Sequence, residues 1–219
     1  MSNDEEIKKN IVDLLYWDSR VDASNVEIEV EKGEVVLRGT VPTYTASEAA
    51  LFDSWKPKGV VKADNQIMVK SYGQRKLPSD SEIQKRIEDM LSWNQSINDM
   101  DVKVSVASGT VSLEGYVDAY WKKLRAEQLA SDVLGVLTVK NKLMIVPTKS
   151  VVDEAIAKDI TLAMEKTDGI NPGTIDVRVK DGKVTLSGNV KGARAYHAAL
   201  ECVVNTFGVV DMENNLSIK

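Results

Sequence analysis

Residues 102–117 read VKVSVASGTVSLEGYV and decide the fold of the chain. Val102, Val104 and Val106 alternate with polar residues before a Ser-Gly pair, and the same alternation resumes after it. A period of two is typical of a strand with one face on a core, and the glycine favours a tight reversal between two strands. We therefore expect a β-hairpin with a single apolar face.

This hairpin sequence occurs three times. VEIEVEKGEVVLRGTV at 26–41 and IDVRVKDGKVTLSGNV at 175–190 carry apolar residues and glycines at the same places. A shift of 76 residues superimposes the first copy on the second, and a further shift of 73 reaches the third. Self-similarity at such a spacing indicates tandem modules. We expect a first module at 2–70, a basic linker at 71–77, a middle module at 78–147 and a third module at 149–219.

Each module contains further elements around its hairpin. An apolar stripe at i, i+4 and i+8, as in Ile7, Ile11 and Leu15, predicts an amphipathic helix before the hairpin. A second helical stretch follows it, and a glycine then leads into a last strand. The order α-β-β-α-β predicts an α+β fold: three small sandwiches, each with two helices on one face of a three-stranded sheet.

The second helix of the first module departs from the repeat. Aligned without a gap, Asp53, Ser54 and Pro57 take columns that are apolar in the middle module. Pro57 is expected to end this helix early. A shifted register would let Phe52 and Trp55 supply the apolar face instead, and the sequence leaves the register open.

Composition excludes several classes of protein. The 219 residues are 43% hydrophobic and 28% charged, which is typical of a globular chain rather than a disordered one. No apolar run approaches the roughly 18 residues that a membrane span needs. The net charge is −5, so binding to nucleic acid or to anionic lipid would have to rest on a local patch.

The N-terminal sequence MSNDEEIKKN has no apolar core of a secretory signal, which predicts a cytoplasmic protein as written. A chain whose signal had been removed would read the same way and would be periplasmic. The single cysteine, Cys202, excludes a disulfide within the chain and fits either location.

The repeated pattern resembles the BON domain (bacterial OsmY and nodulation) family. The resemblance rests on the hairpins quoted above and on the closing stretches GVLTVKNKLMIV and GVVDMENNLSI, and it covers all three modules. It implies α/β sandwiches of bacterial, non-enzymatic proteins that attach to phospholipid or membrane surfaces, often in osmotic-stress and envelope proteins. The family has no catalytic residues to transfer.

Repeated glycines are interpreted as turn and close-approach positions rather than ligand contacts, because glycine tolerates backbone conformations that other residues avoid. They are Gly33, Gly39 and Gly59 in the first module, Gly109, Gly115 and Gly135 in the middle one, and Gly182, Gly188 and Gly208 in the third.

The residues that enzyme chemistry requires do not cluster. His197, the only histidine, lies five positions from Cys202 on a predicted helix, about 140° away around the axis. We expect Cys202 to be a buried core thiol and His197 a boundary residue. We predict no catalytic residue, metal site or cofactor. Nucleic acid is not expected as a partner, since the chain is acidic and lacks a G-x-x-G loop.

The best candidate for a binding surface is YWKKLR at 120–125, where the second helix of the middle module begins. An aromatic ring beside cations suits contact with lipid headgroups. The candidates are Trp121, Lys122, Lys123 and Arg125, with Arg75 and Lys76 of the linker. A solvated helix face with Trp121 packed on the rim of the sheet would explain the same residues without a ligand.

Two further tryptophans share a column at the end of the first helix. Trp17 and Trp93 lie roughly 100° from the centre of the apolar stripe, which places them at the edge of the buried face. They are candidates for an interface with another module, a partner or a membrane, and a role at the rim of the core explains them equally well. The third module has Lys166 at this column.

These observations support a leading hypothesis and two alternatives. The first is a non-enzymatic protein whose modules bind anionic phospholipid, a membrane surface or an envelope component. The second is a scaffold that contacts protein partners through its open sheet faces. The third is binding of a small ligand or monovalent cation through backbone carbonyls, which leaves no side-chain signature.

Overall fold

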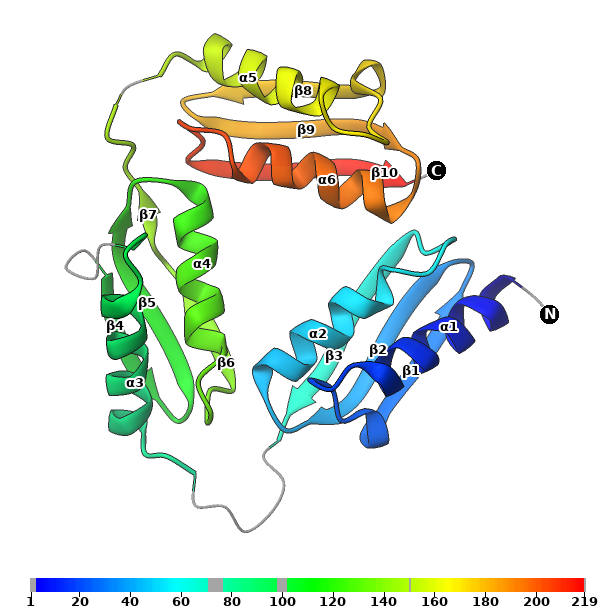
Figure 1. The fold of residues 1–219 in the computed structure, drawn as a ribbon, viewed down its shortest axis with the longest axis vertical. Helices are drawn as coiled ribbons and strands as arrows, with labels where there is room; N and C mark the ends of the chain where they lie inside the picture. Colours follow the sequence, from blue (N-terminus) through cyan, green and yellow to red (C-terminus); the bar gives the residue numbers. More distant parts are fainter. Residues whose placement is uncertain (1–2, 71–76, 98–101, 150, 219) are drawn as a thin grey trace. The chain divides into compact units, whose positions relative to one another are not determined.

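The structure, a computed structural model, describes residues 3–70, 77–97, 102–149 and 151–218. Its elements follow the order helix, strand, strand, helix, strand three times (Figure 1). In each module the two helices lie over the same face of the sheet (Figure 1). The predicted α+β class and the three tandem modules are therefore confirmed.

The first module has a sheet in the order β1-β2-β3, in which β2 pairs antiparallel with β1 and parallel with β3. A short 3-10 helix, Ala23–Asn25, precedes β1. The elements are α1 (Asn3–Trp17), β1 (Val26–Glu31), β2 (Glu34–Val41), α2 (Tyr44–Ser54) and β3 (Lys62–Val69).

The middle module differs from the prediction in its last strand, which is split into two pieces that both pair with β5. The N–H groups of Lys142 and Val146 donate to the carbonyls of Leu113 and Val117. Each donor lies 29 residues after its acceptor, so the register against β5 is the same on both sides of the break. The elements are α3 (Asp80–Trp93), β4 (Val102–Ala107), β5 (Thr110–Val117), α4 (Tyr120–Ser131), β6 (Thr138–Asn141) and β7 (Met144–Ile145).

The third module repeats the topology of the first, with β9 between an antiparallel β8 and a parallel β10. A 3-10 helix, Pro172–Thr174, again precedes the first strand. The elements are α5 (Asp153–Glu165), β8 (Ile175–Lys180), β9 (Lys183–Val190), α6 (Gly192–Val204) and β10 (Asp211–Ile218).

The apolar stripe of each first helix is buried, as its spacing predicts. In the first module Ile7, Ile11 and Leu15 form a core cluster with Val35 and Leu37 of the hairpin. Burial of each such side chain contributes about 1.5–3 kcal/mol before the entropy of ordering is subtracted. The corresponding stripe residues of the other modules, Ile83, Ile87 and Leu91, and Ile156, Ile160 and Met164, are equally buried.

The shifted register considered for α2 is wrong, because Asp53 and Ser54 are buried at the columns that the gapless alignment gives them and Phe52 is 56% exposed. Trp55, directly after the helix, does pack against the first core, as expected. These polar groups are tolerated there because each has a partner. The Ser54 hydroxyl donates to the Leu51 carbonyl at 2.6 Å, and the Asp53 carboxylate lies 2.5 Å from the Lys56 ammonium. The helix ends at Ser54, before the proline.

Glycine is required where the hairpin meets the turn before it. Gly39 has φ of 113°, and a Cβ there would lie 1.9 Å from the carbonyl oxygen of Asn25. Gly188 is in the same position in the third module, 2.2 Å from the Thr174 carbonyl by the same measure. Neither site has room for a side chain.

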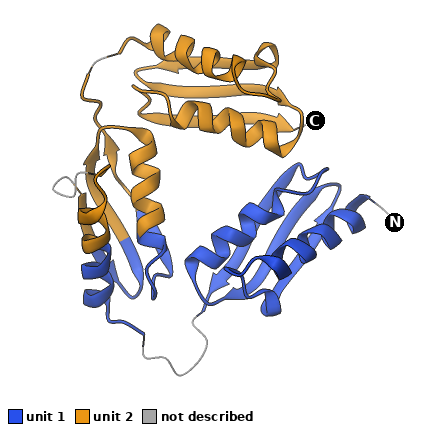
Figure 2. Cartoon of the chain, viewed as in Figure 1, with its two compact units in different colours: residues 1–87, 105–111, 130–140 blue, residues 88–104, 112–129, 141–219 orange. Residues whose placement is uncertain are grey.

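By compactness the chain divides into two units, shown in Figure 2. One contains residues 1–87, 105–111 and 130–140, and the other residues 88–104, 112–129 and 141–219. The first module thus belongs wholly to one unit and the third wholly to the other, while the middle module contributes to both.

Candidate functional site

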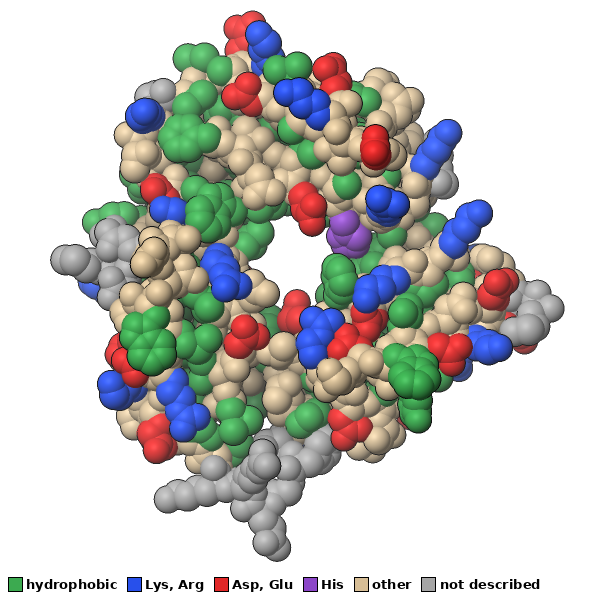
Figure 3. Space-filling view, in the orientation of Figure 1, with side chains coloured by type: hydrophobic (Ala, Val, Ile, Leu, Met, Phe, Trp, Pro, Cys, Tyr) green, Lys and Arg blue, Asp and Glu red, His purple; other side chains and the backbone are tan. Residues whose placement is uncertain are grey.

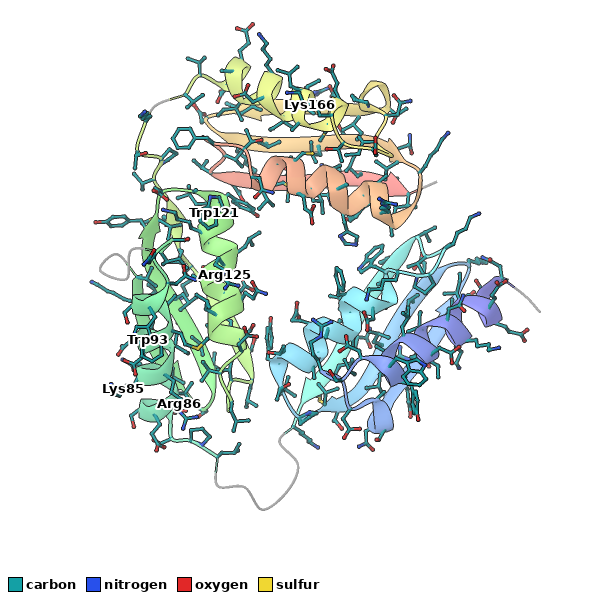
Figure 4. The ribbon with its side chains drawn as sticks, in the orientation of Figure 1. Lys85, Arg86, Trp93, Trp121, Arg125 and Lys166 are labelled. Carbon is teal, nitrogen blue, oxygen red and sulfur yellow. The ribbon has the colours of Figure 1, made fainter. Side chains whose placement is uncertain are left out.

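The two tryptophans at the ends of the first helices are far more exposed than their angular position predicts. Trp17 ends α1 and is 81% exposed, and Trp93 ends α3 and is 80% exposed. The prediction that these tryptophans lie at the edge of the buried face is therefore wrong. In both modules the helix ends at the tryptophan, so no further turn covers the indole. Figure 4 shows Trp93 and, on the third module, Lys166 directly after the end of α5.

The residues around Trp17 are an aromatic ring and two oppositely charged side chains that pair with each other. Tyr16, also exposed, packs edge-on against the Trp17 indole with ring centroids 5.3 Å apart. Arg20 donates to both carboxylate oxygens of Asp18, and this hydrogen bonding holds the pKa of Asp18 well below its usual range. The end of α1 therefore presents two amphipathic rings with little net local charge.

The predicted basic cluster on α4 is only partly available for a ligand. Lys122 is directed to Asp118, with its ammonium 2.7 Å from the carboxylate, and the same ammonium lies 5.7 Å from the centre of the Trp121 ring. Trp121 is 36% exposed. The spacing of Asp118 and Lys122 is i, i+4, so the sequence contained the signal for this pair.

The other predicted cations differ in their accessibility. Arg125 is exposed and donates to the side-chain oxygen of Gln128 at 2.7 Å. Lys123 is half-buried. Figure 4 shows Trp121 and Arg125 on the same helix, one turn apart. Arg75 and Lys76 lie outside the described residues.

Sequence reasoning missed an aspartate that ties each first helix to its hairpin. The carboxylate of Asp153 accepts hydrogen bonds from the N–H groups of Gly182, at 2.9 Å, and Asp181, at 2.8 Å. Asp4 and Asp80 do the same for Lys32 and Gly33 and for Ser108 and Gly109. We call this arrangement the carboxylate clamp. The signal for it in the sequence was that all three modules have aspartate at this column.

An asparagine in each last strand makes a second repeated tie. Asn214 donates from Nδ2 to the Tyr196 hydroxyl of α6 at 2.6 Å and accepts from the N–H of Leu216 at 3.1 Å. Asn65 donates to Ser47 and accepts from Ile67. Asn141 donates to the carbonyl of Lys123 and accepts from Leu143.

Cys202 packs against the third core, but it is half-buried rather than buried as expected. Its sulfur lies 3.7 Å from the Thr167 hydroxyl. Burial lowers the pKa of His197, whose ring packs edge-on against Tyr196. Within the described ranges, His, Cys, Asp and Glu side chains do not gather in threes as a metal site would require.

The face in Figure 3 shows lysines and arginines interspersed with acidic side chains rather than gathered in one basic patch. None of the helices in the described part of the chain has the length and apolar character to cross a bilayer.

Comparisons with known proteins agree with the repeat. The BON domain model matches residues 3–71, 79–147 and 152–219. Osmotically-inducible protein Y of Escherichia coli (strain K12) is 24% identical over 144 residues, which cover 64% of this chain and 72% of that protein.

Two solved structures of CdsD, a structural protein of the type III secretion system of Chlamydia trachomatis, also align. They have 14% and 13% identity, TM-scores of 0.27 and 0.26, and cover 98% and 96% of this chain, and 92% and 95% of their own.

Proposed function

Because the chain belongs to the BON domain family, whose model matches all three modules, we propose that it is a non-enzymatic protein that attaches to anionic phospholipid surfaces. The observation that carries this proposal is the pair of exposed indoles, Trp17 and Trp93, at the same position of two modules. Trp121 and Arg125, one turn apart on the same side of α4, add a third contact.

An indole at the end of a helix suits the boundary between water and hydrocarbon, because its apolar rings enter the headgroup layer while its N–H stays hydrated. Removing a large apolar side chain from water contributes about 1.5–3 kcal/mol. When both indoles of one chain engage the same surface, the second binds at a high effective concentration. Arg125 near an anionic surface adds about 1 kcal/mol, which offsets part of the repulsion from the net charge of −5.

The likeness to osmotically-inducible protein Y supports a role in osmotic or envelope stress. In such a role a non-enzymatic protein would act by binding to a membrane or to an envelope component.

Co-sedimentation with vesicles tests the attachment. The full chain is expected to pellet with vesicles of phosphatidylcholine and phosphatidylglycerol, and less with phosphatidylcholine alone. Trp17→Gln with Trp93→Gln removes both indoles at exposed positions without changing the charge, so the fold is retained while binding is lost. Phe52→Gln, which removes another exposed aromatic ring, is the matched control and should bind normally. Undiminished pelleting of the double tryptophan variant would refute the proposal.

One observation favours a protein partner as a second candidate. On the open sheet face of the middle module, Tyr116 pairs in register with Met144, which is 64% exposed, and Val146 is also exposed. The other modules carry Thr40 or Asn189 at the column of Tyr116. A stoichiometric protein complex that is lost in Tyr116→Ser with Met144→Ser, together with no pelleting on vesicles, would favour this role.

A further inference from the structure

The third module contains a cavity of about 650 Å³ where the loop after α5 meets the start of α6. Its floor is apolar: Val190 and Ala195 are buried and Ile170 is half-buried. Asn171 and Thr174 line it from the loop and Lys191 from the end of β9. Ligand cavities typically have about 300–1,000 Å³ and combine an apolar lining with few polar groups.

Small residues create this cavity. Gly169 has φ of 88°, and a Cβ there would meet no atom within 4 Å. The first module has Arg20 at this column. At the column of Ala195 the middle module has Lys122, whose ammonium reaches Asp118. Asp118 in turn occupies the column of Lys191, so the third module has a cation and a methyl group where the middle module has an ion pair. The middle module's cavity beside this pair is smaller, about 320 Å³.

The charge of Lys191 is not matched by the protein. Its side chain is exposed, and it forms no hydrogen bond or ion pair with any residue in the described part of the chain. An unpaired ammonium at the mouth of an apolar cavity complements a ligand that has one anionic group and an apolar body.

We propose that the third module binds a single-chain amphiphile with an anionic head, which places its alkyl chain over Val190 and Ala195 and its head beside Lys191. This inference is independent of the proposed surface attachment, which uses indoles that the third module lacks. The shared chemistry of the head is an anionic oxygen group, a carboxylate or a phosphate.

Titration of the isotope-labelled full chain by NMR tests the site, with decanoate, decyl phosphate and decanol as probes below their micelle-forming concentrations. We expect saturable shifts of the Gly169, Gly192 and Ala195 amides with the two anions, and at least about tenfold weaker binding of decanol, since a charge-assisted contact is lost. The anion with the lower Kd identifies the head group. Saturable shifts confined to the ends of α1 and α3 would overturn the proposal, although they would leave surface attachment intact.

Two variants separate the head contact from the cavity. Lys191→Gln is expected to weaken decanoate about tenfold and to leave decanol unchanged, whereas Lys158→Gln on α5 should change neither. Lys191→Asp with Ala195→Lys transplants the ion pair of the middle module, so it should narrow the cavity, remove the unpaired cation and weaken binding of all three probes. Equal Kd values for decanoate in the wild-type chain and in Lys191→Gln would overturn the proposal, whether or not the double variant folds.

Discussion

Replacement of Asp153 by alanine removes the carboxylate clamp of the third module. Two charge-assisted hydrogen bonds are lost, those from Asp181 and Gly182. Each is worth about 1.5–3 kcal/mol when buried, and less here because Asp181 is exposed. The clamp also places negative charge in the first turn of α5, which contributes about 0.3–1 kcal/mol. We expect a net loss of about 2–4 kcal/mol in the free energy of unfolding of the third module.

The assay must resolve one module from its neighbours, because three modules in one chain need not unfold as a single two-state unit. Native-state amide exchange provides this resolution through the N–H groups of β9, which open only with their own sheet. Asp153→Asn keeps one acceptor oxygen without charge and should lose about half as much. Glu154→Ala is the matched control: it removes the next acidic residue of the same turn, for which the structure records no hydrogen bond, and should cost a few tenths of a kcal/mol. A loss below about 0.5 kcal/mol for Asp153→Ala would show that the turn holds its own shape and that the clamp is incidental.

Three further outcomes follow from the same structure. Arg20→Gln removes the partner of Asp18 and should lower the free energy of unfolding of the first module by up to about 1 kcal/mol at neutral pH, since the pair is partly exposed. Because the pKa of Asp18 is lowered in the folded protein, this difference should shrink as the pH falls below about 4. Urea titrations at pH 7 and pH 3 will measure it. Gly39→Ala should destabilise the first module by about 2 kcal/mol or more, visible as a lower Tm, because of the positive φ and the carbonyl contact. Asn214→Leu leaves the N–H of Leu216 without its acceptor and should cost about 1–3 kcal/mol by amide exchange, with Asn215→Leu on the exposed face as its control.

The repeat made most of the fold predictable. Alternation, the helical stripe and the turn glycines are local properties, and their threefold recurrence made each element clear. The register of α2 was not predictable in the same way, because the burial of Asp53 depends on an ion pair with Lys56 that composition does not reveal. Hydrophobic pattern alone therefore left the register open.

The candidate site was predictable in its residue types but not in its geometry. Trp17 and Trp93 were identified from their shared column, yet their exposure depends on where the helix stops. The cavity of the third module was not found at all, because it arises from side chains that are absent at Gly169 and Ala195. The volume that these two small residues leave empty depends on how the loop after α5 and the start of α6 pack in three dimensions.

The asparagine of the last strand bears on how three copies of one fold coexist in a single chain. Near-identical neighbours can exchange strands, since any copy's edge offers the same row of backbone donors to its sibling. Asn65, Asn141 and Asn214 each bind an edge-strand N–H within their own module and fasten that strand to its own helix. Because each copy of the domain contains this asparagine, each copy disfavours strand exchange with its neighbours. Further copies could be added to the chain without other substitutions to prevent mispairing.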